Sequence, residues 1–216
     1  MSVTADHQAY ILIWDFKMVK GTGRRPDLRV VKTGEAIKNA FKAMICEMPA
    51  DKITVKELTE RARIHRKTFY LHYNSIEALY EEMLKIIAEG YYEEMDRLSV
   101  PYSFKEVNRV FFTYFPTQEK YVERLMCDES YGSIINRLFA ETLRHNLDRY
   151  DPYAVFNEQT RNLINVYFVT ASLEMYRQWV RDGKKLSVDE LAKVTGCLMD
   201  EGISGLTGSV EKDIQE

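Results

Sequence analysis

The stretch ITVKELTERARIHRKTFYLHYNSIEAL, residues 53–79, decides the fold predicted for this chain. It opens with Thr54-Val-Lys-Glu57, in which the threonine hydroxyl can accept a hydrogen bond from the Glu57 amide while the glutamate reaches back, a capping box. Apolar residues at 55, 58 and 62 then recur at helical spacing. We therefore expect a short helix from Thr54, a turn at residues 63–65, and a new helix after it.

The remainder of this stretch predicts two more helices. A short one covers residues 66–73, with Phe69 and Tyr73 spaced to pack inward. Asn74-Ser75-Ile76-Glu77 is a second capping signature, and the helix that it starts continues to about residue 98, before Pro101. At 1.5 Å per residue that helix is about 35 Å long, enough to join two halves of a molecule.

The sequence on either side is also helical in pattern. Upstream, residues 33–48 carry an apolar stripe that Pro49 ends, made of Ala36, Ile37, Ala40, Phe41, Met44 and Ile45. Downstream we expect five helices, near residues 103–115, 117–127, 130–150, 157–182 and 187–206. No segment alternates with period two. The prediction is an all-α protein with a flexible arm (1–28), a three-helix helix-turn-helix domain (29–75), a helical bundle (76–208) and a tail (209–216).

Charge divides the chain in the same way. The 216 residues carry a net charge of −3, but residues 17–73 hold 14 Lys and Arg against 6 Asp and Glu. The remaining residues hold 16 against 27. A basic block attracts a phosphate backbone and an acidic remainder is repelled by it, although charges can also cluster by chance on a solvated helix face.

Other functional classes find little support in the sequence. Three scattered cysteines, Cys46, Cys127 and Cys197, give neither a disulfide framework nor a zinc motif. We find no nucleophile motif and no glycine-rich phosphate loop, so we expect no enzyme, no cofactor and no metal. The apolar run at 10–14 is too short for a signal peptide, and no stretch reaches membrane-spanning length, so we expect a cytoplasmic protein.

A helix-turn-helix binds DNA by laying its second helix in the major groove, with the first residues of that helix nearest the bases. Here Arg66 or Lys67 can donate to guanine, and Thr68 or Leu71 can contact a thymine methyl group. The wider set expected at DNA, phosphate contacts included, comprises Arg29, Thr54, His65, Arg66, Lys67, Thr68, Tyr70, Leu71 and His72. The two histidines lack acidic or thiol partners nearby, so DNA explains them better than a metal.

These residues resemble the signature of the tetracycline-repressor (TetR) family of bacterial regulators. The resemblance rests on Thr54, Val55, Leu58, Ala62, Ile64, Thr68-Phe69-Tyr70, His72-Tyr73, Ser75, Glu77 and Leu79, and on the lead-in from Arg29 to Phe41. The chain departs from the pattern at four positions. Arg63 replaces the usual glycine of the turn, and His65 stands where a serine often caps the helix. Lys67 stands where a small residue is common, and Ile76 replaces a lysine that commonly binds phosphate.

The resemblance implies a homodimeric repressor that binds a palindromic operator, with a small-molecule effector bound among the middle helices. It implies a dimer interface on the last two helices, for which we select Ala171, Ser172, Met175, Trp179 and Leu198. As effector contacts we select Asn165, Tyr167 and Thr170. A second domain that binds a protein partner instead of a small molecule is the alternative.

Overall fold

The computed structural model describes residues 27–213, with side chains described as far as residue 201. Most of the predicted arm (1–28) and the last residues of the predicted tail lie outside this range. Within it the chain contains α-helices and 3-10 turns and no β-strand, so the all-α prediction is confirmed. The α-helices are α2 (Leu28–Glu47), α3 (Val55–Arg61), α4 (Arg66–His72), α5 (Ile76–Asp96), α6 (Phe104–Tyr114), α7 (Lys120–Cys127), α8 (Gly132–Arg149), α9 (Glu158–Arg181) and α10 (Val188–Asp213), and the 3-10 turns are η1 (Ala50–Lys52), η2 (Phe115–Thr117) and η3 (Glu129–Tyr131).

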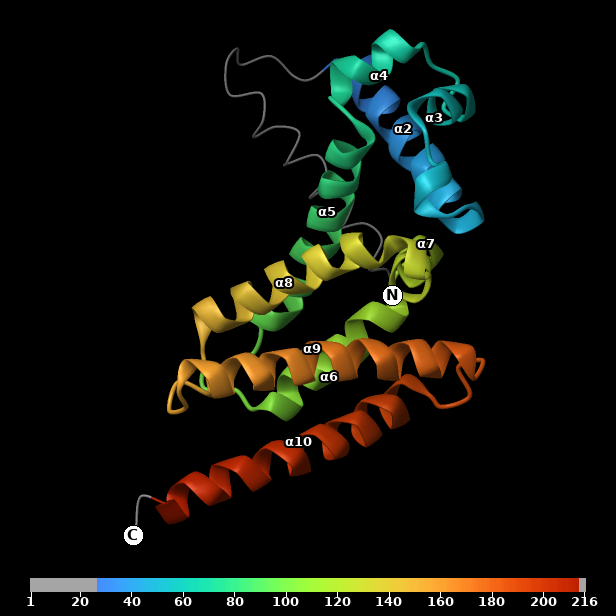
Figure 1. Ribbon diagram of the computed structural model, residues 1–216. Helices are drawn as coiled ribbons and strands as arrows, with labels where there is room; N and C mark the ends of the chain where they lie inside the picture. The colour runs from blue at the N-terminus through green and yellow to red at the C-terminus, as the bar shows by residue number, and fades with distance from the viewer. Residues whose placement is uncertain (1–26, 214–216) are drawn as a thin grey trace.

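Helices α2, α3 and α4 form a compact unit at one end of the molecule (Figure 1). Their inward-facing side chains are fully buried: Ile37, Phe41, Met44 and Ile45 from α2, Leu58 from α3 and Phe69 from α4. These are residues at which the sequence showed helical periodicity. Burying side chains of this size stabilises a fold by about 1.5–3 kcal/mol each before entropic costs.

Helix α5 connects this unit to the rest of the chain (Figure 1). The Ser75 hydroxyl caps it by accepting from the Ala78 amide at 3.2 Å, as the capping signature predicted. Its 21 residues correspond to about 32 Å of helix. Buried Leu79 and Tyr80 lie at its start, and buried Tyr91 and Met95 lie near its end, so a single rigid element is anchored in both halves of the molecule.

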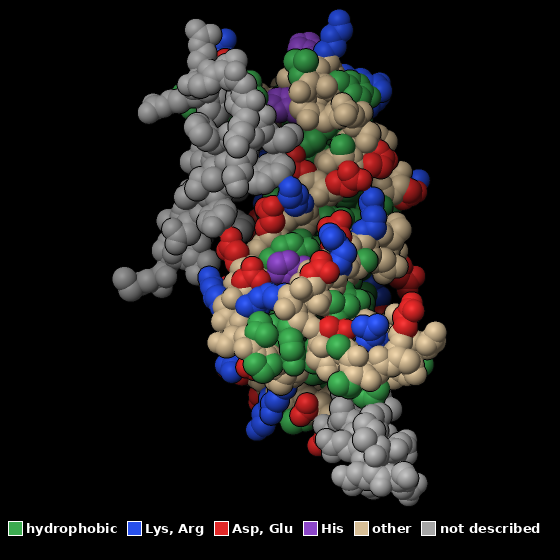
Figure 2. All heavy atoms as spheres, turned by 90° about the vertical axis from the view of Figure 1, so that its left-hand side faces the viewer, with side chains coloured by type: hydrophobic (Ala, Val, Ile, Leu, Met, Phe, Trp, Pro, Cys, Tyr) green, Lys and Arg blue, Asp and Glu red, His purple; other side chains and the backbone are tan. Residues whose placement is uncertain are grey.

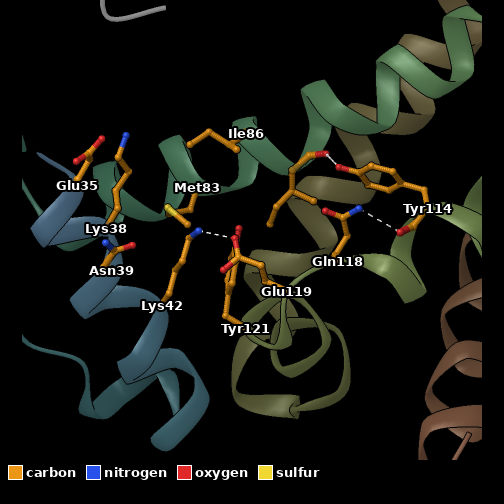
Figure 3. Close-up of a pocket in the computed structure, with 11 residues that line it drawn as sticks. Glu35, Lys38, Asn39, Lys42, Met83, Ile86, Tyr114, Gln118, Glu119 and Tyr121 are labelled. Atoms are coloured by element: carbon orange, nitrogen blue, oxygen red, sulfur yellow. Dashed lines mark hydrogen bonds and ion pairs between the residues drawn. The ribbon is translucent and has the colours of Figure 1, made fainter. Parts of the chain in front are cut away.

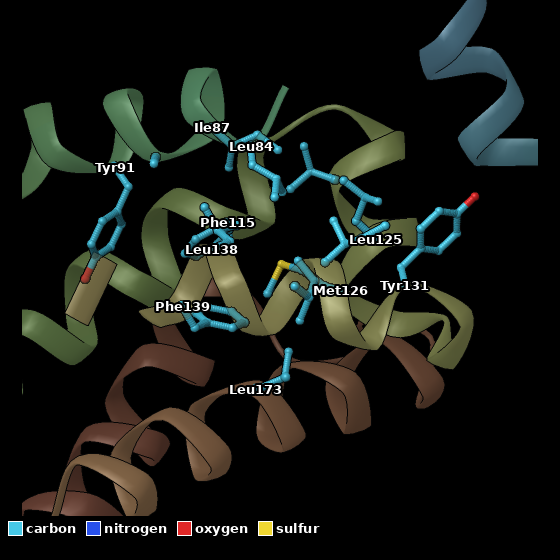
Figure 4. Packing of buried hydrophobic residues seen from close by; sticks show 14 of the residues in the cluster. Leu84, Ile87, Tyr91, Phe115, Leu125, Met126, Tyr131, Leu138, Phe139 and Leu173 are labelled. Atoms are coloured by element: carbon cyan, nitrogen blue, oxygen red, sulfur yellow. The ribbon is translucent and has the colours of Figure 1, made fainter. Parts of the chain in front are cut away.

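The C-terminal helices enclose an aromatic core. Tyr91 from α5 stacks on Phe115 with ring centroids 5.7 Å apart, and Phe139 from α8 lies 5.9 Å from the same ring. Leu138 and Leu173 complete this packing (Figure 4). Helix α10 lies against α6 and α9. The space among the middle helices around these rings is therefore filled by side chains.

Two helix boundaries differ from the prediction. Helix α2 begins at Leu28 rather than near residue 33, because the Asp27 carboxylate accepts from the Arg29 amide at 2.9 Å and caps the helix there. Thr33 lies inside the helix, where its hydroxyl donates to the Arg29 carbonyl at 2.8 Å. Helix α10 continues to Asp213, beyond the predicted end near residue 206.

The two halves of the molecule are joined by polar contacts around α2. Tyr131, just before α8, donates its buried hydroxyl to the Met48 carbonyl at 2.6 Å. The Ala50 amide donates to the Ser130 hydroxyl at 3.2 Å. Lys42 pairs with Glu119 at 2.6 Å across the same junction. The sequence did not predict these contacts.

Candidate nucleic-acid interface

The turn between α3 and α4 is set by the backbone of Arg63. This residue has φ = 54°, in the left-handed region that glycine adopts most easily. Its amide donates to the Glu60 carbonyl at 3.2 Å, and the Ile64 amide donates to the Thr59 carbonyl at 3.0 Å. These two bonds form a Schellman motif, which ends α3 and redirects the chain into α4. Arginine stands here where glycine is usual in the family pattern, and it adopts the positive φ that a glycine would tolerate more easily.

The start of α3 is capped by Thr54, whose hydroxyl accepts from the Glu57 amide at 3.2 Å. The reciprocal half of the predicted capping box is replaced by another contact. The Glu57 carboxylate accepts from the Arg61 side chain at 3.0 Å instead. Thr54 itself is exposed at the helix N-terminus, a place where backbone amides favour an anion.

Helix α4 has one buried side and one open side. Phe69 is fully buried and Tyr73, directly after the helix, is 8% exposed, and their rings lie 5.8 Å apart. On the opposite side Leu71 is 85% exposed and Tyr70 is 44% exposed. The outer side of α4 therefore presents an aromatic and an aliphatic side chain to the surroundings.

The polar residues predicted at DNA divide into two groups. Exposed positions are held by Arg29, His65, Arg66 and Lys67. Arg66 donates to the Tyr70 hydroxyl at 3.1 Å, and its guanidinium lies 5.6 Å from the centre of that ring. Thr68 and His72 are half-buried. A Cβ atom added to Gly34 of α2 would lie 3.8 Å from the His72 ring, so His72 lies beside α2.

Basic side chains that the sequence analysis passed over also lie on this unit. Lys56 on α3 and Arg63 in the turn are both exposed. In the sequence only their charge indicated a contact with DNA, and the other lysines and arginines of the basic block carry the same charge. In Figure 2 histidine and basic side chains lie at the upper end of the molecule, while most acidic side chains on the visible face lie below them.

The residues predicted to contact an effector do not line the aromatic core. On α9, Tyr167 is 42% exposed, Thr170 is exposed and Asn165 is half-buried. Tyr167 and Thr170 share an open side of α9 with Leu163 and Val166, which are 72% and 63% exposed. Helical spacing places Tyr167 and Thr170 on one side of α9, but it does not show which side of the bundle that is.

The residues predicted at a dimer interface also separate. Ser172 is 1% exposed and lies 4.0 Å from the Met199 sulfur, while Trp179 is 7% exposed and donates its indole N–H to the Leu186 carbonyl at 2.8 Å. Both side chains belong to the packing between α9 and α10 within one chain. Ala171 and Met175 are half-buried, and Leu198 is 56% exposed.

Over the residues that the structure describes, no group of three or more histidine, cysteine or acidic side chains is arranged to hold a metal ion. None of the helices in that range has the length and apolar character needed to cross a bilayer.

Comparison with known proteins gives a short sequence match and extensive structural matches. No family model matches the chain. An uncharacterized HTH-type transcriptional regulator, YxbF of Bacillus subtilis (strain 168), is 33% identical over 86 residues, which are 38% of this chain and 23% of that protein. The match therefore spans less than a quarter of that relative's length.

The structural matches extend over most of each molecule. A TetR transcriptional regulator from Streptococcus agalactiae 2603V is 21% identical with a TM-score of 0.60, over 79% of this chain and 95% of that chain. A second match is NalD, the secondary repressor of the MexAB-OprM multidrug efflux pump in Pseudomonas aeruginosa. It is 18% identical with a TM-score of 0.62, over 81% of this chain and 96% of that chain. The fatty acid degradation regulator FadR from Bacillus halodurans is 15% identical with a TM-score of 0.55, over 77% and 94%. The chain therefore has the all-helical fold of the TetR-type transcriptional regulators.

Proposed function

We propose that this chain is a transcriptional regulator that binds operator DNA through α4. The observation that carries this proposal is the open side of α4, where Lys67, Tyr70 and Leu71 are exposed while Phe69 anchors the helix from behind. A helix held in this way can enter the major groove and present its first residues to base edges. The basic side chains on the same unit would neutralise phosphates on either side.

The proposed regulator acts as a homodimer through α9 and α10. Five exposed apolar side chains on these helices support this: Leu163, Val166, Tyr167, Val194 and Leu198. Exposure of these apolar side chains to water is unfavourable. A second copy of the chain, related by a twofold axis, would cover the same side chains on both copies. Two α4 helices would then be available for the two halves of a palindromic operator.

A small-molecule effector bound in the C-terminal helices would modulate the affinity for DNA. We expect the regulator to repress transcription and to act in the cytoplasm. An effector changes DNA affinity only to the extent that it binds one spacing of the two α4 helices more tightly than another. The structural similarity to NalD, a repressor, is consistent with this function.

Selection of bound sequences from a random DNA pool at physiological salt tests the proposal. Enrichment of a palindrome is the expected result. A folded protein that enriches no sequence and shows no salt-dependent retention on DNA would contradict it.

Substitution of Tyr70 locates the interface. Since Tyr70 is open and lies outside the core, Tyr70→Ala should weaken operator binding by about tenfold or more, as expected when a contact worth about 1.4 kcal/mol is lost. Its melting temperature should remain close to that of the wild type. Tyr70→Phe, measured in parallel by fluorescence anisotropy, separates the hydroxyl from the ring. Unchanged affinity of Tyr70→Ala would show that α4 is not in the groove.

A further inference from the structure

A cavity of about 280 Å³ lies at the junction of the two halves of the molecule, away from the open sides of α4 and α9 (Figure 3). One wall is α2, which carries Lys38, Asn39 and Lys42, and the opposite walls are α5 and the segment from Tyr114 to Tyr121. Its volume is near the lower end of the range for small-molecule sites, about 300–1,000 Å³.

The cavity combines an apolar wall with an aromatic ring. Met83 and Ile87 on α5 are almost fully buried, and Ile86 beside them is half-buried. The Tyr121 ring is 4% exposed. The Tyr114 hydroxyl is already used, since it donates to the Ile87 carbonyl at 2.7 Å. An apolar group therefore has a matching surface here.

One end of this wall already holds an ammonium group. The Lys42 Nζ lies 2.6 Å from a Glu119 carboxylate oxygen and 5.1 Å from the centre of the Tyr121 ring. A carboxylate beside an aromatic face attracts organic cations through charge and through the ring quadrupole. Glu119 and Tyr121 thus form a binding geometry for a cation, and the ammonium group of Lys42 occupies it.

The charges around the cavity also favour a cation over an anion. Lys38 is paired with Glu82 at 3.2 Å, and Lys42 is paired with Glu119. Glu35 lines the same cavity and has no ion-pair partner in the part of the chain that the structure describes. Both ammonium groups are thus already paired with carboxylates, and the cavity has a further carboxylate in its lining, so an added anion would have to displace a carboxylate from one of the lysines.

We propose that this cavity binds a small amphipathic organic cation, whose ammonium group replaces that of Lys42 between Glu119 and Tyr121. The apolar part of the ligand lies against Met83, Ile86 and Ile87. Binding releases Lys42 from Glu119 and so removes an ion pair that joins α2 to α7. Binding itself is independent of the proposed function, whereas an effect on DNA affinity rests on it.

Hexyltrimethylammonium is a suitable probe, with hexanoate and hexanol as the anionic and neutral molecules of equal chain length. Protein labelled with 13C at the methionine methyl groups reports on the site, because Met83 lines the cavity. The signal of Met83 is identified as the one that disappears in the Met83→Leu variant. We expect hexyltrimethylammonium to shift this signal in a saturable manner and at a concentration at least about tenfold lower than either comparison molecule.

Two substitutions should change this affinity in opposite directions. Glu119→Gln should weaken binding of the probe by about twofold to fivefold, because an anionic partner that is largely exposed is lost. Lys42→Met should strengthen it, because the competing ammonium is removed. Glu93→Gln removes an exposed carboxylate of α5 that does not line the cavity and should leave affinity unchanged. Circular dichroism establishes that each variant is folded.

The outcomes separate the proposal from its alternatives. No saturable Met83 shift with the probe, or equal shifts with hexanol, would overturn it. Tighter binding of hexanoate would show that the site takes an anion. Weaker binding of the cation by Lys42→Met would show that the ligand does not take the place of the lysine ammonium. DNA affinity that stays constant while the probe saturates the Met83 signal would leave the binding site intact and refute only its regulatory effect.

Discussion

Removing the Tyr131 hydroxyl should destabilise the junction between the two halves of the protein. Helix α2 ends at Glu47, and Pro49 shortly after it has no amide hydrogen to donate to the Ile45 carbonyl one turn earlier. The Tyr131 hydroxyl occupies that region, 3.5 Å from the Ile45 oxygen and 2.6 Å from the Met48 oxygen. Tyr131→Phe keeps the ring and its packing but leaves these carbonyls without their buried donor.

The size of the effect follows from burial. Tyr131 is 0% exposed, so water cannot readily replace its hydroxyl. Loss of a buried hydrogen bond with the acceptor left unpaired costs about 1–3 kcal/mol. For a chain of this length each kcal/mol lowers the melting temperature by about 2–4 °C. Urea denaturation should show an earlier midpoint with an unchanged slope, because the surface exposed on unfolding is the same.

Tyr153 provides the matched control. It is also buried, at 7% exposure, but its hydroxyl has no hydrogen-bond partner in the described part of the chain. Tyr153→Phe therefore removes a buried polar group that was never paired, and stability should stay constant or rise. If both variants lose the same stability, or if Tyr131→Phe loses none, then the hydrogen bond to Met48 does not hold the junction together.

Three further predictions concern the turn, the α6 cap and the dimer surface. Arg63→Gly should raise stability by about 0.5–1 kcal/mol in urea denaturation, because glycine adopts φ = 54° without strain; a loss of stability would contradict the strained turn. The Ser103 amide, together with the Ser103 hydroxyl, donates to Glu106 and lowers the pKa of that carboxyl, so this stabilisation is present above the unfolded pKa, about 4.3, and is lost as the pH falls through the folded value. Of these two hydrogen bonds Ser103→Ala removes only that of the hydroxyl and should flatten part of this acid titration of stability; an unchanged profile would refute the contribution of the hydroxyl. Leu198→Glu should shift the protein toward monomer in sedimentation, whereas Val100→Glu, at a similarly exposed site between α5 and α6, should not; dimers of equal strength in both would place the interface elsewhere.

The sequence predicted the helices well because helix ends are encoded locally. Ser75 and Thr54 accept from amides three residues later, and Pro49 follows the end of α2. Each signal acts within a few residues, so it can be recognised without the rest of the fold. The start of α2 was missed because Asp27 lies within a basic segment that reads as an arm, although it caps the helix in the usual way.

It was harder to predict what covers a given side chain. Trp179 and Leu198 both seemed suited to an interface, yet only Leu198 is open, because the loop before α10 returns the Leu186 carbonyl to the indole N–H of Trp179. Helical spacing shows which residues share a side of a helix. It does not show whether another element of the same chain, a second copy or water covers that side.

The junction shows why function in this fold depends on contacts that local patterns do not encode. Helix α2 contributes to the core behind α4, yet its outer residues Lys38 and Lys42 are paired with Glu82 and Glu119 of the other half. Tyr131 holds its C-terminal end. Any rotation of the α2–α4 unit against α7 must therefore break or lengthen these bonds. The cation proposed to bind beside them would select one orientation of α4, and the energy available for such a switch would be limited to the difference in its affinity for the two orientations.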